Sequence, residues 1–211
     1  MRSYPIIEGR KIRIGLVGCG RIAKNHFDSI ATYPDEFELV SICDNNPTAL
    51  QLATDTYKVT SYLSLTEMLK NEEIDAVSIC TPSGIHPEQT IEIAEAGAHV
   101  ISEKPMATRW SDGVQMVKAC DSKGVRLFVV KQNRRNTTLR LLKRAMEEKR
   151  FGRIYMVNIN VFWTRPQEYY DQAKWRGTWE LDGGAFMNQA SHYIDLVDWL
   201  IGPVEKIQAM M

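Results

Sequence analysis

The chain has 211 residues, of which 44% are hydrophobic and 25% are charged, a composition that is ordinary for a globular protein. Its 26 basic and 26 acidic side chains cancel, so charge gives no reason to expect a nucleic acid or a membrane surface as a partner. The sequence has neither an apolar run near the roughly 18 residues that span a bilayer nor the apolar core of a signal peptide. Its four cysteines form no CxxC pair, which favours a reducing, cytoplasmic location.

Short apolar runs rich in Val and Ile alternate with helix-like segments over the first 130 residues. The runs, apolar on both faces like covered parallel strands, are Ile12–Val17, Phe37–Cys43, Ala76–Cys80, His99–Ser102 and Arg126–Val130. The helical segments between them are Ile22–Tyr33, Thr48–Tyr57, Leu65–Asn71, Pro87–Ala96 and Asp112–Lys123. Ser111 fits an N-cap, and Gly97 and Gly124 fit helix C-termini. This rhythm predicts an α/β fold in which residues 1–131 form a Rossmann domain with a doubly wound parallel sheet.

The rhythm changes after residue 131. We expect a helix at Thr137–Lys149, a strand at Arg153–Trp163, a polar loop at Thr164–Gly184, a helix at Phe186–Ile201 and the start of a strand at Val204–Met211. One strand and one helix cannot bury both of their apolar faces. Residues 132–211 are therefore expected to begin a second domain that is incomplete, and the sequence to be the front part of a longer chain.

A glycine pattern follows the first predicted strand and opens the first predicted helix. Gly18 permits a tight turn, Gly20 lets a pyrophosphate approach the backbone, and Ala23 allows close helix packing. Arg21 and Ile22 lie where free N–H groups of the helix N-terminus would face the phosphates. Glycine-rich turns also arise for structural reasons, but this strand-turn-helix context favours dinucleotide binding.

Asp44 ends the second predicted strand, 26 positions after Gly18. A carboxylate there can accept hydrogen bonds from the adenosine ribose, with Asn45 beside it. It would also repel a 2′-phosphate, and no Arg lies nearby in sequence to hold one, so we expect NAD in preference to NADP. The alternative is a plain turn residue before Pro47.

Polar clusters follow three other strands, and ligands gather beyond the carboxyl ends of parallel strands. The clusters are Thr81–His86, Glu103–Pro105 and Lys131–Arg135. Lys104 precedes a proline, which disfavours the α region and holds the lysine extended, so that its ammonium points across the strand end. The competing interpretation is an ordinary salt bridge.

His192 lies on an otherwise apolar helical segment, four positions after Asn188 and thus on the same helical face. A lone histidine in such a place is usually a satisfied core residue. Against that reading stand Gly183 and Gly184 just upstream, which allow close backbone approach, and the amide of Asn188, which can orient the ring. We expect no metal site, because no second His or Cys lies at ligand spacing.

Taken in order, the segments GLVGCGRIA, CTPSGIHPE, EKPMA, QNRR, KWRGTW and GGAFMNQASHYIDL resemble the Gfo/Idh/MocA oxidoreductase family over essentially the whole chain. More narrowly, FVVKQNRRN and VFWTRPQEYYDQAKWRGTWELDGGAFMNQASH are similar to the bacterial UDP-N-acetyl-glucosaminuronic acid 3-dehydrogenases. The family implies an N-terminal Rossmann domain and a C-terminal mixed α/β sheet domain, which begins in residues 132–211 and is used for substrate binding and oligomerisation.

The resemblance also implies roles for individual residues. Lys104 matches the catalytic lysine and His192 the catalytic histidine, whereas Asn188 stands where many relatives carry the Asp of a proton relay. Trp175 and Arg176 match a pair that reaches the cofactor. The remaining positions assigned to cofactor binding are Thr81, Pro82, Ser83, His86, Glu103 and Asn133.

These residues lead to a functional hypothesis: oxidation of a secondary hydroxyl, at C3, of a UDP-linked acetamido-uronic acid in O-antigen synthesis. His192 takes the hydroxyl proton and Lys104 stabilises the alkoxide. Arg165 or Lys131 pairs with the uronate unless both are solvated surface charges, and Tyr169 joins Asn188 in binding substrate.

Several alternatives remain open. The chain can be another NAD(P)-dependent sugar or polyol dehydrogenase of the family, or an idle NAD-binding module. Relatives also suggest a homo-oligomer, a dimer or tetramer, and 2-oxoglutarate as the compound that reoxidises NADH.

Overall fold

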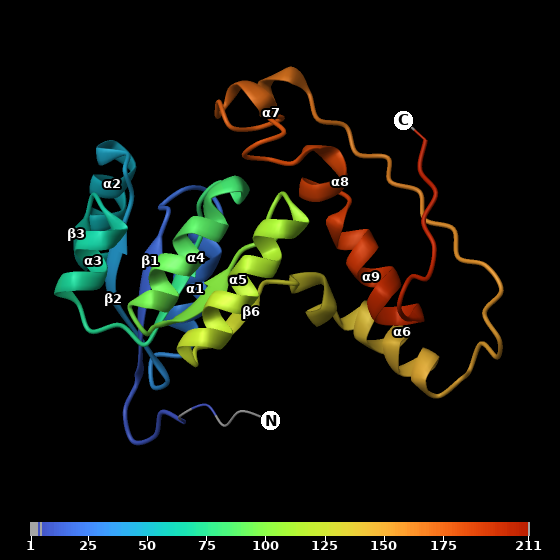
Figure 1. The fold of residues 1–211 in the computed structure, drawn as a ribbon, viewed down its shortest axis with the longest axis horizontal. Helices are drawn as coiled ribbons and strands as arrows, with labels where there is room; N and C mark the ends of the chain where they lie inside the picture. Colours follow the sequence, from blue (N-terminus) through green and yellow to red (C-terminus); the bar gives the residue numbers. More distant parts are fainter. Residues whose placement is uncertain (1–3, 5, 211) are drawn as a thin grey trace.

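The computed structural model describes residue 4 and residues 6–210, and its first half is built on a six-stranded parallel sheet (Figure 1). The strand order is β3-β2-β1-β4-β5-β6, and every neighbouring pair is parallel. The strands are β1 (Ile12–Val17), β2 (Phe37–Cys43), β3 (Thr60–Tyr62), β4 (Ala76–Ile79), β5 (His99–Ser102) and β6 (Leu127–Val129). The order reverses direction between β1 and β4, the point at which doubly wound sheets bind ligands.

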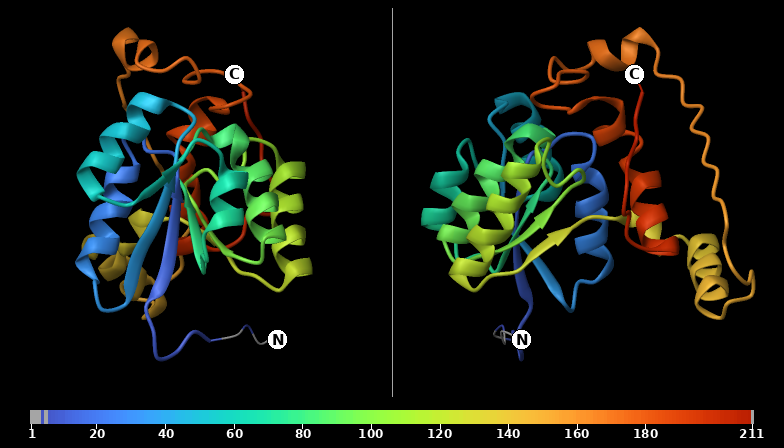
Figure 2. Two further views of the ribbon diagram at one scale, coloured as in Figure 1. Left: turned by 90° about the vertical axis from the view of Figure 1, so that its left-hand side faces the viewer. Right: turned by 45° about the vertical axis from the view of Figure 1, so that its right-hand side comes forward.

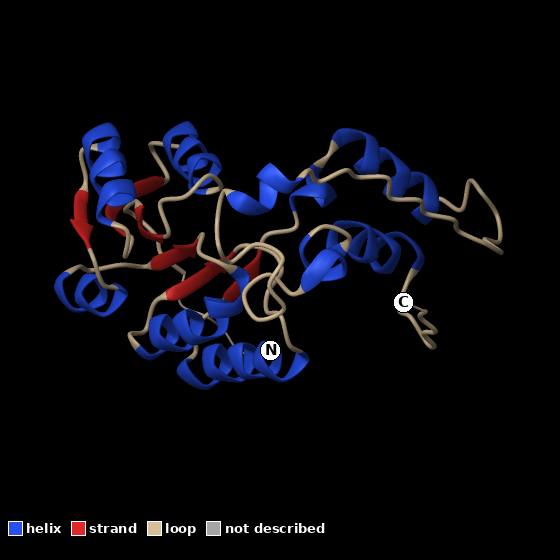
Figure 3. Ribbon diagram, turned by 90° about the horizontal axis from the view of Figure 1, so that it is seen from above, coloured by secondary structure: helices blue, strands red, loops and turns tan. Residues whose placement is uncertain are grey.

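Helices cover both faces of this sheet (Figure 3). One buried cluster joins α1 (Ala23–Thr32) and α2 (Pro47–Tyr57) to Leu16 and Ile42 on the strands. The other joins α3 (Leu65–Asn71), α4 (His86–Glu95) and α5 (Trp110–Lys123) to the opposite strand faces. Adjacent strand residues such as Leu16 and Val17 belong to different clusters, which confirms a sheet buried on both sides.

The structure differs from the sequence-based prediction for this half in two local features. Helix α5 begins at Trp110 with Arg109 as its N-cap, so Ser111 lies inside the first turn and its hydroxyl donates to Asp112. Strand β3 is absent from the expected list because its three residues, Thr60–Tyr62, contain no apolar run. It pairs only with β2, at the edge of the sheet.

The regular secondary structure of the described second half consists of helices alone, joined by long loops. It contains the 3₁₀ turn η2 (Gln132–Arg135) and the helices α6 (Thr137–Glu147), α7 (Gln167–Asp171), α8 (Gly184–Asn188) and α9 (Ser191–Ile201). Helices α6 and α9 pack together, and η2 contacts both of them. Among the described residues, none of the helices has the length and apolarity required to cross a membrane.

The predicted strand at Arg153–Trp163 is wrong for this structure. The segment runs along the outside of the molecule between α6 and α7 and carries no strand (Figure 2). A strand needs the N–H and C=O groups of a neighbour, and no described segment pairs with this one. Residues 203–210 are likewise without strand structure, and Met211, the last residue of the predicted strand there, lies outside the described residues.

The predicted helix at Phe186–Ile201 is interrupted. It divides into α8 and α9, because the N–H of Ala190 bonds five positions back to the carbonyl of Ala185 and widens the turn. Asn188 therefore ends one helix while His192 lies in the first turn of the next. The expectation that both share one continuous helical face is wrong.

Candidate active site

The glycine turn lies at the switch point of the sheet. Gly18 has φ +90°, and a Cβ on it would come within 2.8 Å of the backbone of Cys80, so only glycine fits between the ends of β1 and β4. A Cβ on Gly20 would meet no protein atom within 4 Å, which leaves its backbone open to a ligand. No side chain caps α1 at Ile22, and Arg21 beside it is exposed. The N-terminus of α1 therefore presents the positive end of the helix dipole, which suits an anion.

Asp44 is bonded directly to this turn. One carboxylate oxygen accepts from the N–H of Cys19 at 2.7 Å, and the other accepts from the N–H of Asn46 at 2.8 Å. Asn45, which stands between Asp44 and Asn46 in the sequence, is exposed. The carboxylate holds the glycine turn in place and still has lone pairs left for hydroxyl donors, because each oxygen can accept more than one bond.

The loop before α8 closes against the end of β4. Gly84 donates its N–H to the carbonyl of Leu181 at 3.0 Å, and a Cβ on Gly84 would lie 2.2 Å from the carbonyl oxygen of Glu180. Thr81, Pro82 and Ser83 lead into this contact. The close approach explains the glycine here and brings the second half of the chain onto the strand ends of the first.

The ring of His86 points into the protein. The residue is fully buried, and its ring nitrogens lie 3.0 Å from the carbonyls of Thr81 and Pro105. Burial also lowers the pKa of His86. The side chain ties together the segments that follow β4 and β5. A cofactor contact of His86 stays a prediction, which the inward direction of the ring does not favour.

Lys104 reaches from the end of β5 to α8. Its Nζ donates to the backbone carbonyl of Asn188 at 2.9 Å and to the side-chain Oδ1 at 3.2 Å. The amide nitrogen of Asn188 in turn donates to Asp182. Asp182 is 3% exposed and its second oxygen accepts from the N–H of Gly177 at 2.7 Å.

Asp182 is the residue that the sequence analysis missed. Its signal was weak: an acid directly before the Gly183-Gly184 pair. The structure shows that a carboxylate does stand behind Lys104, with the Asn188 amide between the two. The chain thus keeps a carboxylate near the lysine although position 188 itself is an amide.

The charges around Lys104 and His192 act on each other. Burial lowers the pKa of Lys104, while Glu103 and Asp182 oppose this and Lys131 and Arg165 reinforce it. Burial also lowers the pKa of His192, and the next causes are the charges of Lys104 and Lys131. The charge of Lys104 therefore favours the neutral form of the His192 imidazole, which is the form that a general base requires.

Lys131 already has a partner on α9. Arg134 binds both oxygens of Asp195, at 2.8 and 2.7 Å, and Lys131 lies 3.6 Å from the same carboxylate. These charges hold η2 against α9, and Asn133 lies on the same turn.

The loop around α7 groups the other predicted substrate and cofactor residues. The guanidinium of Arg165 lies 5.3 Å, and that of Arg176 4.2 Å, from the ring centroid of Tyr169, and Arg176 also lies 5.7 Å from the ring of Trp175. Arg176 donates to the carbonyl of Tyr169 at 2.9 Å. The structure thus ties Arg176 to Tyr169, whereas Arg165 is near enough to Lys104 to lower its pKa. No described group of three or more His, Cys, Asp and Glu side chains is placed to hold a metal ion.

Comparison with known families agrees with this arrangement. Residues 12–131 match the family model described as an oxidoreductase family with an NAD-binding Rossmann fold, and residues 139–211 match the Gfo/Idh/MocA C-terminal domain. The chain belongs to the Gfo/Idh/MocA family. Within it, the chain is 28% identical over 210 residues to the scyllo-inositol 2-dehydrogenase (NADP(+)) IolW of Bacillus subtilis, covering 97% of this chain and 57% of that protein.

Two solved structures of Gfo/Idh/MocA proteins are much more similar. The WlbA dehydrogenase of Bordetella pertussis, in complex with NADH and UDP-GlcNAcA, is 67% identical with a TM-score of 0.93, covering 95% of this chain and 60% of that one. The WlbA dehydrogenase of Chromobacterium violaceum, in complex with the same two molecules, is 65% identical with a TM-score of 0.95, covering 97% and 59%. The chain thus spans about 60% of the length of these relatives.

Proposed function

We propose that this chain carries the cofactor site and the acid–base residues of an NAD-dependent dehydrogenase. Its substrate is a UDP-linked acetamido-uronic acid, oxidised at the C3 hydroxyl for O-antigen lipopolysaccharide synthesis. The observation that carries the proposal is the pair of hydrogen bonds from the Nζ of Lys104 to Asn188, and the charge of Lys104 also lowers the pKa of His192. Identity of 67% to a dehydrogenase solved with NADH and UDP-GlcNAcA supports the choice of cofactor and sugar.

The residues at the switch point fit NAD. Gly20 leaves its backbone exposed at the N-terminus of α1, where a pyrophosphate is stabilised, and the buried Gly18 forms the tight turn before it. The carboxylate of Asp44 suits ribose hydroxyls and disfavours a 2′-phosphate. When bound, NAD supplies the acceptor for a hydride from the carbinol carbon, chemistry that belongs to the cofactor.

The side chains at the end of β5 and in α9 perform the acid–base work. His192, kept neutral by burial and by the charge of Lys104, accepts the hydroxyl proton. Lys104 donates a hydrogen bond to the same oxygen and stabilises negative charge as it develops. Asn188 fixes the ammonium through its two oxygens, and Asp182 orients that amide.

Arg165 is the better candidate for the substrate carboxylate. Lys131 is engaged by Asp195, whereas the Nε of Arg165 is buried with no hydrogen-bond partner among the described residues. A guanidinium can bind a carboxylate through two parallel hydrogen bonds. Tyr169, which contacts Arg165, would complete the wall of this subsite.

The test is NADH formation by the full-length protein with a UDP-linked acetamido-uronate, compared with the same UDP-sugar carrying CH₂OH in place of the carboxylate. We expect turnover with the uronate and a loss of at least about tenfold without it, because a charge-assisted pair of about 1.5–3 kcal/mol is removed. Equal turnover with both sugars would contradict the assigned substrate. Turnover with inositol alone would favour the second candidate.

That second candidate is a sugar or polyol dehydrogenase of different specificity, supported by the similarity to the scyllo-inositol enzyme. An idle NAD-binding module is disfavoured, because Lys104 and His192 are both present and the charge of Lys104 lowers the pKa of His192.

We also propose a homo-oligomer, a dimer or a tetramer. The segment between α6 and α7 exposes large apolar side chains, such as Phe162 at 90%, which an assembly would cover. The proposal includes the reoxidation of NADH by 2-oxoglutarate. It also includes a cytoplasmic location, where NAD and UDP-sugars are supplied.

A further inference from the structure

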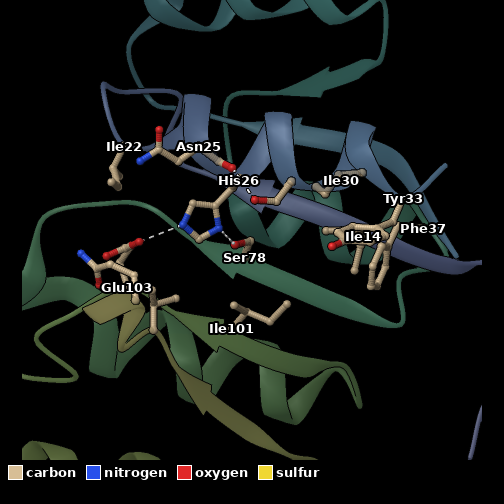
Figure 4. Close-up of a pocket in the computed structure, with 13 residues that line it drawn as sticks. Ile14, Ile22, Asn25, His26, Ile30, Tyr33, Phe37, Ser78, Ile101 and Glu103 are labelled. Atoms are coloured by element: carbon tan, nitrogen blue, oxygen red, sulfur yellow. Dashed lines mark hydrogen bonds and ion pairs between the residues drawn. The ribbon is translucent and has the colours of Figure 1, made fainter. Parts of the chain in front are cut away.

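His26 on α1 lies between two buried polar groups of the sheet (Figure 4). Its Nδ1 is 2.7 Å from the hydroxyl of Ser78 on β4, and its Nε2 is 2.9 Å from a carboxylate oxygen of Glu103, directly after β5. Ser78 is 2% and Glu103 is 6% exposed. The three side chains therefore form a continuous buried chain from α1 to the strand end that carries Lys104.

The surroundings of this chain are apolar. It borders a cavity of about 410 Å³ whose wall includes Ile14, Ile22, Ile30, Tyr33, Phe37 and Ile101. A buried polar group without a partner costs about 1–3 kcal/mol, so a polar chain in such a wall persists only if its members satisfy one another. Both nitrogens of His26 are satisfied here.

The geometry fixes the proton arrangement of His26. An ionised carboxylate only accepts hydrogen bonds, so Nε2 must carry the proton that faces Glu103. Burial works to raise the pKa of Glu103, but the bond from His26 and the neighbouring positive groups outweigh it, and the net direction is downward. Glu103 therefore stays ionised at neutral pH with one oxygen held by His26.

The second oxygen of Glu103 accepts from the backbone N–H of Lys104 at 3.1 Å. The carboxylate thus bridges α1 and the lysine itself. Among the charges around Lys104, that of Glu103 raises the pKa of the lysine most, and that of Asp182 comes next. The charges of Lys131 and Arg165 lower it. A change in the position of Glu103 therefore reaches Lys104 both through the backbone and through charge.

We propose that His26 is a positioning residue for the dehydrogenase reaction: its Nε2–H clamps the carboxylate of Glu103, and that carboxylate holds Lys104 in place through the backbone N–H of the lysine. The inference rests on the proposed function, but its first test does not need turnover. Ser78 acts with His26, because its hydroxyl holds the far side of the ring.

The first measurement is the titration of Lys104 in the full-length protein, followed as its rate of acetylation by trace acetic anhydride against pH, with peptide mass spectrometry. His26→Leu and His26→Asn remove the donor to Glu103, since asparagine is too short to reach it. Both should lower the titration midpoint of Lys104, by up to about one pH unit, because an opposite charge within 4–6 Å typically shifts a pKa by about one to three units. His26→Gln, whose amide can occupy the place of Nε2, should restore most of the original midpoint.

Ser29→Ala is the matched control. Ser29 lines the same cavity on the same helix, and its hydroxyl donates to the carbonyl of Asn25, not to Glu103. This variant should leave the Lys104 midpoint unchanged. Glu103→Gln removes the carboxylate charge itself, and its shift of the Lys104 midpoint is the full effect with which the His26 variants are compared.

The second measurement is steady-state kinetics on the same variants. We expect kcat to fall about tenfold in His26→Asn with KM for the sugar changed less than twofold, and to recover in His26→Gln. An unchanged Lys104 midpoint in folded His26→Asn, beside a clear shift in Glu103→Gln, would overturn the inference and leave His26 as a packing residue. If the proposed substrate is not oxidised at all, the titration still decides the role of His26.

Discussion

The Nζ of Lys104 lies 3.2 Å from the side-chain oxygen of Asn188, a residue 84 positions further along the chain. This contact joins the Rossmann half to the helical half at the end of β5. It also links the lysine to a carboxylate through the amide at position 188. The amide of Asn188 accepts from the lysine through its oxygen and donates to Asp182 through its nitrogen.

Replacing Asp182 should therefore disturb Lys104 without touching it. In Asp182→Ala, the Asn188 amide and the N–H of Gly177 lose their acceptor, so we expect a stability loss of about 1–3 kcal/mol in chemical denaturation. The freed amide can rotate, so kcat should also fall by about ten- to a hundredfold while the Kd for NAD changes little. Asp171→Ala, on the exposed helix α7, is the control. A normal kcat in folded Asp182→Ala would refute the orienting role.

Asp44 should control both cofactor affinity and cofactor choice. Asp44→Ala removes a charged acceptor for the ribose and the bond to the N–H of Cys19, so we expect NAD binding to weaken by at least about tenfold in a fluorescence titration. NADP binding should weaken less or improve, because a repulsive charge is gone. Asp55→Ala on α2, where Asp55 bonds only to Gln51 in the described contacts, should change neither. Equal loss for both cofactors would show that Asp44 serves the turn alone.

The pH profile should report His192. Burial, followed by the charges of Lys104 and Lys131, lowers its pKa, so kcat/KM should rise with pH to a plateau with a midpoint below 6.5. Removing the lysine charge in Lys104→Met should move this midpoint upward for the residual activity, because a repulsion is lost. Lys70→Met on α3 should not. An unchanged midpoint in Lys104→Met would show that the charge of Lys104 does not act on His192.

The sequence predicts the Rossmann half well because each of its signals is local. Leu16 and Val17 are both buried, on opposite faces, and such two-sided burial leaves a continuous apolar run that can be recognised without knowledge of the partners. The glycine turn is equally local, since Gly18 and Gly20 follow β1 directly. The short strand β3 is not predicted, because its three residues, of which Thr60 is exposed, are too few to show a recognisable apolar pattern.

The second half shows what local pattern cannot decide. Residues 153–163 have a strand-like composition, but a strand exists only where another segment supplies hydrogen bonds. The break between α8 and α9 depends on one backbone bond, from Ala190 to Ala185, that no residue type announces. In the site, Lys104 and His192 were recognisable by motif, whereas Asp182 acquires its role only through its contact with Asn188.

The central claim is that Lys104 and His192 act together on one hydroxyl group, and kcat of Lys104→Met, His192→Asn and the double variant tests it most directly. Measured in the full-length protein with a UDP-linked acetamido-uronate, each single variant should lose about 10²–10⁴-fold in kcat. The double variant should lose little more, because residues that act as a unit are not additive. Near-normal turnover in both single variants would contradict the account.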